Sequence, residues 1–294
     1  MGEPSKIVGI KILQGKDSIT IFQIKYVESI LQKARMEWAN TICTPLDPKL
    51  PIKPNLEGNK GDKRNSFACL LGSLQYLAMV TCPDITFAVN WLSAYTANPS
   101  LAHQMAVKHI PRYLAGTKDL RITYRKPQQS QSHLELLHRF TDAAYANNSN
   151  YHSTSGYVFI VGGGAVMWES RKQTSMAISS TEAEYVALSE AARESKWLQV
   201  LYEELGFEQN YPIPLFGDNQ GLFVMANNPQ FHKRSKHIKI RWHWVREQIE
   251  KKSIELQDCQ DPENTADVLV KQLTPEKHRK HTKGLGLIWL EGEC

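Results

Sequence analysis

The sequence has few cysteines, and they follow no recognisable pattern. Their number is odd, and none of their spacings is typical of a zinc site: Cys43, Cys69, Cys82, Cys259 and Cys294. A disulfide framework is therefore not expected, and the thiols fit a protein of a reducing compartment. The chain also lacks a signal peptide and any apolar run long enough to span a bilayer, so we expect no membrane partner.

Charge of one sign does not dominate the composition either. The 294 residues include 35 basic and 30 acidic side chains, which gives a formal net charge of +5 with histidine neutral. Such mild basicity permits a nucleic-acid partner without requiring one. With 41% hydrophobic residues, the chain has the composition of a globular protein with room for two domains.

The N-terminal half is predicted to hold strands followed by helices. Two short strand-like runs occupy residues 6–23, so we expect the chain to begin partway through a longer protein; a helix is expected over residues 25–36. Because prolines recur through residues 45–54, this span is expected to be a linker or an extended arm. Apolar residues at helical spacing then predict helices between residues 66 and 116, the last of which Pro111 should kink or end early.

The C-terminal half changes to a strand-rich pattern. Three strand-like runs are expected at residues 134–142, 155–163 and 165–170, and a long helix at 180–205. Then follow a strand at 212–218, a short helix to about 227, a basic helix at 236–252, a strand at 253–259 and a last helix from 264. This order implies a mixed sheet with helices packed on it, and therefore an α/β domain.

Four acidic residues of this half lie at the edges of these elements. Asp142 and Asp218 end strand-like runs, Glu184 lies in the first turn of the long helix, and Asp267 lies at the start of the last one. Carboxylates gathered in one interior repel one another unless a cation holds them, and oxygen-rich clusters suit hard divalent ions such as Mg²⁺. Two such ions about 3.5–4 Å apart are the usual apparatus for phosphodiester cleavage. We therefore expect the four carboxylates to converge on one pocket.

Helix geometry separates Glu184 from its neighbour Glu182. Steps of three and four residues from Glu184 reach Leu188, Ala191 and later positions of an apolar stripe, whereas the same steps from Glu182 reach a solvated face. Glu182 fits a structural role, because it is an acid in the first turn that follows a Ser or Thr cap and complements the helix dipole. An acid in line with buried residues needs another reason to be there, so we assign function to Glu184 and structure to Glu182.

Taken singly, the three aspartates also fit ordinary structural roles. Asp142 suits a turn at the end of a strand, Asp218 suits a helix cap, and Asp267 suits the dipole of a helix capped by Asn264. Their joint arrangement at strand ends and helix starts favours a shared site, because ligands gather at strand C-termini in α/β sheets.

Several short motifs occur in a specific order. They are LGSLQYL (71–77), PDI (83–85), RYLAGT (112–117), TDA (141–143), SSTEAEY (179–185), DNQ (218–220), KHI (236–238) and ADVL (266–269). The last five resemble the ribonuclease H domain of copia-type retrotransposon polyproteins, and the first three are similar to the connection that precedes it. Residues 2–12 and 25–31 resemble the end of the reverse transcriptase.

This resemblance covers nearly the whole chain and implies four segments. They are a reverse transcriptase remnant (1–45), a linker (46–65), a smaller, mainly helical connection segment (66–128) and a ribonuclease H-like domain (133–282). For that domain it implies a mixed five-stranded sheet flanked by helices, and cleavage of the RNA strand of RNA–DNA hybrids with two Mg²⁺ or Mn²⁺ ions. The implied catalytic and metal-binding acids are Asp142, Glu184, Asp218 and Asp267. The remainder of the retrotransposon polyprotein is an implied partner, and the implied location is cytoplasmic, in virus-like particles, or nuclear.

The sequence departs from the family pattern in several places. Ala144 stands where the family has a second acid, residues 257–260 hold no histidine where related ribonucleases carry one, and Pro111 replaces a helix residue. The polymerase motif Tyr-x-Asp-Asp does not occur, so DNA synthesis by this chain is not expected. A non-catalytic nucleic-acid-binding remnant therefore stays open as an alternative. An integrase-type or resolvase-type nuclease is a third, less favoured because integrase-type sites place their glutamate after both aspartates.

Substrate binding is expected from a basic segment at the start of the helix over residues 236–252. The candidate nucleic-acid contacts are Lys233, Arg234, Lys236, His237, Lys239 and Arg241. Cations contact phosphates, and interleaved aromatic residues stack on sugars or bases. The alternative is that Ile238, Trp242, Val245 and Ile249 form a buried stripe while the cations are only solvated, and Trp242 fits the core better than a contact.

Overall fold

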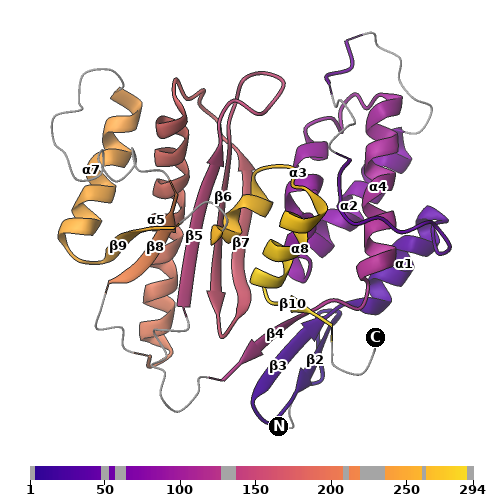
Figure 1. Ribbon diagram of the computed structural model, residues 1–294, viewed down its shortest axis with the longest axis horizontal. Coiled ribbons are helices and arrows are strands. Elements are labelled where there is room, and N and C mark those ends of the chain that lie inside the picture. Colours follow the sequence, from indigo (N-terminus) through magenta and orange to yellow (C-terminus); the bar gives the residue numbers. More distant parts are fainter. Residues whose placement is uncertain are drawn as a thin grey trace. The chain divides into compact units, whose positions relative to one another are not determined.

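The computed structural model describes residues 4–47, 53–56, 64–126, 137–207, 212–218, 236–259 and 263–289. The chain divides into two compact units, each of which is described by itself (Figure 1). The first unit comprises Met1–Lys126, Gly162–Ala165 and Lys271–Cys294, and the second comprises Pro127–Val161 and Val166–Val270. Among the helices of the described ranges, none is long and apolar enough to cross a membrane.

The first unit contains an antiparallel sheet of five strands in the order β1-β2-β3-β4-β10. The strands are β1 (Lys6–Ile7), β2 (Ile10–Gln14), β3 (Ser18–Phe22), β4 (Arg121–Arg125) and β10 (Leu287–Ile288). The span 6–23, expected to hold two strands, holds three, because Val8 and Gly9 have positive φ angles of 46° and 82° and form the turn of a hairpin between β1 and β2. Two consecutive residues with positive φ are the requirement of the tightest hairpin turn, and glycine meets it without strain.

Helices make up the rest of the first unit. They are α1 (Ile24–Ala34), α2 (Arg64–Val80), α3 (Thr86–Ser93), α4 (Leu101–Thr117) and α8 (Pro275–Gly284), with a 3-10 turn η1 (Pro83–Ile85) before α3. The helix expected over residues 25–36 is α1, which buries one face through Val27, Ile30 and Leu31. These side chains join a core that includes the fully buried Leu74 and Leu77 of α2.

Pro111 lies inside α4, and the expectation that it ends the helix early is wrong. The helix starts with a capping box between Ser100 and His103 and continues to Thr117. Pro111 is buried, as are Ile110 and Leu114 of the same helix. Burial of this face therefore offsets the one backbone hydrogen bond that proline cannot make.

The second unit contains a mixed sheet in the order β7-β6-β5-β8-β9. Its strands are β5 (Leu137–Ala144), β6 (Thr154–Val161), β7 (Gly164–Lys172), β8 (Ile213–Gly217) and β9 (Ile254–Asp258). The pairing of β5 with β6 is antiparallel, whereas β8 pairs in parallel with both β5 and β9. The expected order of strands along the chain is confirmed.

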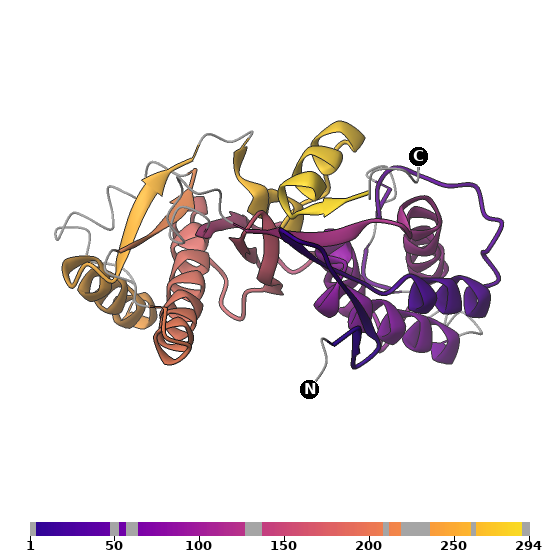
Figure 2. The same ribbon diagram turned by 90° about the horizontal axis from the view of Figure 1, so that it is seen from below.

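Two long helices pack side by side on one face of this sheet, α5 (Ser180–Glu204) and α7 (Lys236–Glu250), as Figure 2 shows. The ring centroids of Tyr185 on α5 and Trp242 on α7 lie 5.4 Å apart, and both belong to one buried core with Val245, so the core assignment of Trp242 is confirmed. The last helix of this unit is only a 3-10 turn, η3 (Thr265–Leu269), capped by Asn264. A mixed five-stranded sheet flanked by helices is the ribonuclease H-like architecture that the resemblance implies, and this fold prediction is confirmed.

Candidate metal centre

The parallel pairing of β5 with β8 brings two of the predicted acids to one edge of the sheet. Arg139 is level with Leu215 and Phe140 with Phe216, an offset of 76 residues that also separates Asp142 from Asp218. Asp218 directly follows the last residue of β8. Since paired strands lie about 4.8 Å apart, residues that are level on β5 and β8 are close neighbours.

The start of α5 is fixed by its own cap. Ser179 precedes the helix, and its hydroxyl accepts a hydrogen bond from the Glu182 N–H at 3.1 Å. The Glu182 carboxylate in turn accepts one from the Ile178 N–H at 2.9 Å. Glu182 thus has the capping role that was expected, but it is buried, with 7% of its surface exposed, and does not lie on a solvated face. Two residues further on, Glu184 is also buried.

Asp142, Glu184 and Asp218 meet in one cluster. One ligand oxygen from each carboxylate lies within 4.8 Å of the other two. Asp142 and Glu184 are buried and Asp218 is half-buried, while the Asp142 Oδ1 accepts a hydrogen bond from the Ala143 N–H at 2.8 Å. Buried carboxylates at this spacing cost free energy unless a cation offsets their charge. The all-oxygen donor set fits a hard divalent ion such as Mg²⁺ or Mn²⁺.

The 3-10 turn η3 packs on the face of the sheet to which Asp142 points. Asp142 pairs directly with Gly156 of β6, and residues paired in this way point to the same face. A Cβ atom added to Gly156 would lie 2.6 Å from Val270 Cγ1 and 2.9 Å from Leu269 Cβ. Glycine is therefore required at this position for η3 to approach β6 so closely.

Asp267 is carried by η3 and is fully buried. The side chain of Asn264, which caps η3, also donates a hydrogen bond from Nδ2 to the Thr141 carbonyl at 3.0 Å. This bond joins η3 to β5 beside Asp142. Asp267 is nevertheless not one of the three acids whose ligand atoms meet within 4.8 Å, so its role as a fourth ligand stays a prediction.

Cys259 lies at the same edge of the sheet and was not singled out from the sequence. It follows β9, and its N–H donates to the Gly217 carbonyl at 2.8 Å, which places it level with Asp218. Burial, and to a smaller extent nearby carboxylates that include Asp218 and Asp267, together raise the pKa of the Cys259 thiol to about 11. The thiol is therefore uncharged at neutral pH. Its position at the end of the strand expected over residues 253–259 was its one signal in the sequence.

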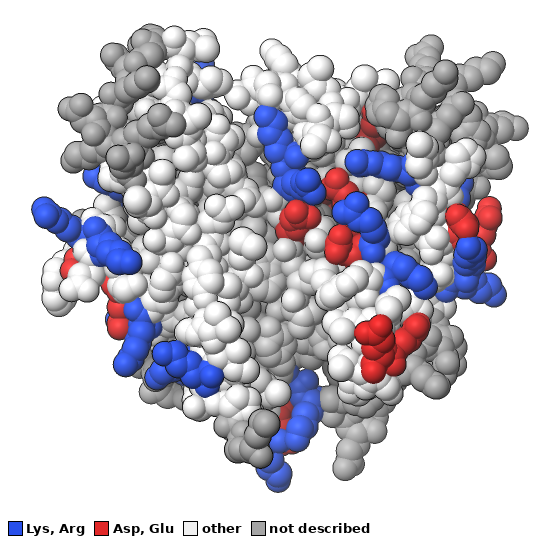
Figure 3. All heavy atoms as spheres, turned by 180° about the vertical axis from the view of Figure 1, so that it is seen from behind, with Lys and Arg blue, Asp and Glu red and all other residues white. Residues whose placement is uncertain are grey.

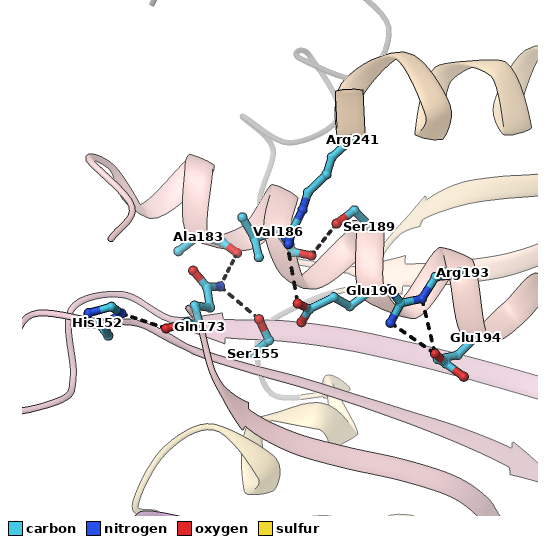
Figure 4. Close-up of polar contacts among 10 residues, drawn as sticks. All are labelled: His152, Ser155, Gln173, Ala183, Val186, Ser189, Glu190, Arg193, Glu194 and Arg241. Atoms are coloured by element: carbon cyan, nitrogen blue, oxygen red, sulfur yellow. Dashed lines mark hydrogen bonds and ion pairs between the residues drawn. The ribbon is translucent and has the colours of Figure 1, made fainter. Parts of the chain in front are cut away.

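The predicted nucleic-acid contacts lie mostly where the structure gives no description. Lys233 and Arg234 lie outside the described residues, and so do the side chains of Lys236, His237 and Lys239. Arg241 is described, and its Nη1 lies 3.8 Å from Glu190 Oε1 of α5 (Figure 4). The contact of these residues with nucleic acid stays a prediction.

A cavity of about 300 Å³ lies beside this ion pair, between α5 and α7. It is lined by Ser189, Glu190, Arg193, Ile240, Arg241 and Trp244. Charges of both signs are also interspersed on the face of the molecule shown in Figure 3, where Lys and Arg side chains lie next to Asp and Glu side chains. Because Glu190, Arg193 and Arg241 line the cavity, a phosphate backbone bound there would meet charges of both signs.

Comparison with known proteins finds relatives over nearly the whole chain. The chain is 34% identical over 285 residues to the retrovirus-related Pol polyprotein from transposon TNT 1-94 of Nicotiana tabacum, which covers 94% of this chain and 21% of the relative. It is 32% identical over 290 residues to the retrovirus-related Pol polyprotein from transposon RE2 of Arabidopsis thaliana, which covers 98% of this chain and 19% of the relative. The chain thus spans about a fifth of the length of these relatives. No profile of a known protein family matches it.

A similar solved structure is that of LC11-RNase H1 in complex with an RNA/DNA hybrid. Its TM-score is 0.35 at 17% sequence identity, and the match covers 46% of this chain and 93% of the solved chain.

Proposed function

Because the chain belongs to the Pol polyproteins of copia-type retrotransposons, we propose that its second unit is a ribonuclease H that cleaves the RNA strand of RNA–DNA hybrids. The observation that carries this proposal is the meeting of Asp142, Glu184 and Asp218 within 4.8 Å. The three carboxylates come from three separate elements, which are β5, α5 and the end of β8. An RNA–DNA hybrid is the proposed substrate because the resemblance to the ribonuclease H domain of this family implies it. The remainder of a retrotransposon polyprotein is a proposed partner.

The chain's own contribution is to hold carboxylates at fixed positions. The β5–β6 pairing fixes Asp142, the register of β8 fixes Asp218, and the capped start of α5 fixes Glu184. These acids, with Asp267 as a proposed fourth, would hold two divalent cations. When bound, such ions lower the pKa of an attacking water and stabilise the departing 3′ oxygen. The expected products are a 5′-phosphate on one fragment and a 3′-hydroxyl on the other.

The test is cleavage of a labelled RNA–DNA hybrid by the purified chain with Mg²⁺ or Mn²⁺. Short RNA fragments are expected from the wild type and none from Asp218→Asn, which removes one negative ligand from the cluster. Glu203→Gln is the matched control, because it makes the same type of change at an exposed position near the end of α5 and should cleave normally. Absence of cleavage by the wild type with either ion would reject the proposal.

A non-catalytic nucleic-acid-binding protein is the second candidate. Ala144 of β5 favours it, because this residue leaves the strand without the second acid that the family carries. Hybrid binding that is unchanged by EDTA, together with no cleavage, would support this candidate over the nuclease.

A further inference from the structure

Gln173 is a buried glutamine between the sheet and the first turn of α5. It directly follows β7, and only 3% of its surface is exposed. Its Nε2 donates hydrogen bonds to Ser155 Oγ of β6 and to the Ala183 carbonyl of α5, both at 2.9 Å (Figure 4). One side-chain amide therefore joins β6, the end of β7 and the start of α5.

The backbone of Gln173 is fixed as well. Its N–H donates to the Ser153 carbonyl at 2.8 Å, and its carbonyl oxygen lies 2.7 Å from His152 Nδ1. A backbone carbonyl only accepts, so His152 donates from Nδ1. With both the backbone and the side chain bonded, Gln173 has little freedom to move.

The Ala183 carbonyl also decides which way the side-chain amide points. This carbonyl only accepts, so the NH₂ group of Gln173 and not its Oε1 must face it. Oε1 is buried and has no hydrogen-bond partner within the described part of the chain. The amide donor therefore faces Ala183 at the cost of leaving the buried acceptor Oε1 unsatisfied.

The residues that Gln173 joins are the neighbours of two proposed metal ligands. Ala183 directly precedes Glu184, and Ser155 pairs across the strands with Ala143, which directly follows Asp142. The position of the first turn of α5 against β6 therefore sets how far the Glu184 carboxylate lies from that of Asp142. We infer that Gln173 is a positioning residue for the Glu184 ligand, an inference that rests on the proposed function. Removing a residue that orients a metal ligand commonly weakens metal binding at the site.

The test measures Mn²⁺ binding to the full chain without nucleic acid, from the paramagnetic resonance signal of the free ion. Gln173→Met keeps the side-chain length but removes the donor, and it should bind Mn²⁺ about 10- to 100-fold more weakly than the wild type. Lys172→Met places the same side chain at the exposed neighbouring position and should bind like the wild type. The Mg²⁺ concentration for half-maximal hybrid cleavage should rise in Gln173→Met, with the maximal rate largely restored at high Mg²⁺.

Ser155→Ala keeps the test decisive if Gln173→Met does not fold. It removes one of the two acceptors and should weaken Mn²⁺ binding in the same direction, by less. Unchanged Mn²⁺ affinity in folded Gln173→Met, with only a lower melting temperature, would mean a purely structural role and overturn the inference while the proposed function stands. If the wild type binds Mn²⁺ but does not cleave the hybrid, the nuclease proposal is rejected. Weaker Mn²⁺ binding by the variants would in that case still support the positioning role of Gln173. A wild type that binds no Mn²⁺ would overturn both.

Discussion

Arg139 places a guanidinium inside the second unit, on the strand that carries Asp142. It is 1% exposed, its Nη1 donates to Ser195 Oγ, and its guanidinium carbon lies 5.5 Å from the ring centroid of Phe159. Nε and Nη2 are buried and have no hydrogen-bond partner among the residues that the structure describes. Burial lowers the pKa of Arg139 to about 9. A charge held in this way destabilises the folded state.

Arg139→Met should therefore raise the free energy of unfolding at pH 7, by about 1–3 kcal/mol. The new side chain has a similar reach and needs no hydrogen bond. Because the folded pKa of about 9 lies below the ordinary value of 12.5, the wild type should regain stability as the pH rises between these values, and the advantage of the variant should shrink. Urea unfolding at pH 7 and pH 10 measures both effects. A less stable variant at pH 7 would show that the guanidinium is stabilising after all.

At the scale of single elements, η3 depends on the absence of a side chain at Gly156. Gly156→Ala would put a Cβ 2.6 Å from Val270 Cγ1, so η3 must move away from β6. The expected loss of stability is about 1–3 kcal/mol, as for other overpacked positions. If Asp267 is a metal ligand, Mn²⁺ affinity should fall as well.

Gly72→Ala is the control for this change. Gly72 lies in α2, where an added Cβ meets nothing within 4 Å, so the variant should gain up to about 1 kcal/mol from helix propensity. Thermal unfolding of both variants measures the difference. Equal stability of Gly156→Ala and wild type would contradict the close packing of η3 on β6.

Elements with a strong local pattern were predictable from the sequence, and elements defined by distant partners were not. The long helix expected over 180–205 is found at Ser180–Glu204, because a serine cap and an apolar stripe are both local signals. The strand β4 was missed, since its place in a sheet depends on pairing with β3 about a hundred residues earlier. The same holds for β10, which has only two residues and pairs with β4. The continuation of α4 past Pro111 was not predictable, because the burial of that helix face is a tertiary effect.

At the scale of the whole molecule, acid stability reflects two opposed buried groups of the first unit. Burial raises the pKa of Asp84 to about 6, and the Tyr113 hydroxyl donates to its Oδ2 at 2.5 Å. Burial lowers the pKa of His278 on α8 to about 4, and its Nε2 lies 3.3 Å from the Asp84 carbonyl. On acidification Asp84 takes up its proton earlier in the folded state and stabilises it, whereas His278 takes up its proton earlier in the unfolded state and destabilises the fold.

Asp84→Asn should therefore make the loss of stability between pH 6.5 and pH 4 steeper. The substitution removes the stabilising proton uptake by Asp84 and leaves the destabilising one by His278. The free energy of unfolding should therefore fall by an additional amount on the order of 2 kcal/mol over this range. The amide oxygen of the new residue still accepts from Tyr113. Denaturant unfolding at several pH values measures the slope, and an unchanged slope would contradict the raised pKa of Asp84.

The candidate site shows the same division between local and distant information. Asp142, Glu184 and Asp218 were identified from short motifs, and helix spacing separated Glu184 from Glu182. Their distances were not predictable, because they depend on the register of β5 with β8 and on where α5 begins against β6. Gln173 and Cys259 were missed for a related reason, since the elements that each of them contacts are remote in the sequence.

Diffraction from Mn²⁺-soaked crystals of the full chain, at a wavelength where manganese scatters anomalously, tests the central claim most directly. An anomalous peak is expected within about 2.0–2.3 Å of carboxylate oxygens of Asp142, Glu184 and Asp218. The peak should be lost from crystals of Asp218→Asn. A wild-type crystal with no peak at these three side chains, at Mn²⁺ concentrations that support hybrid cleavage by ribonucleases of this fold, would contradict the account.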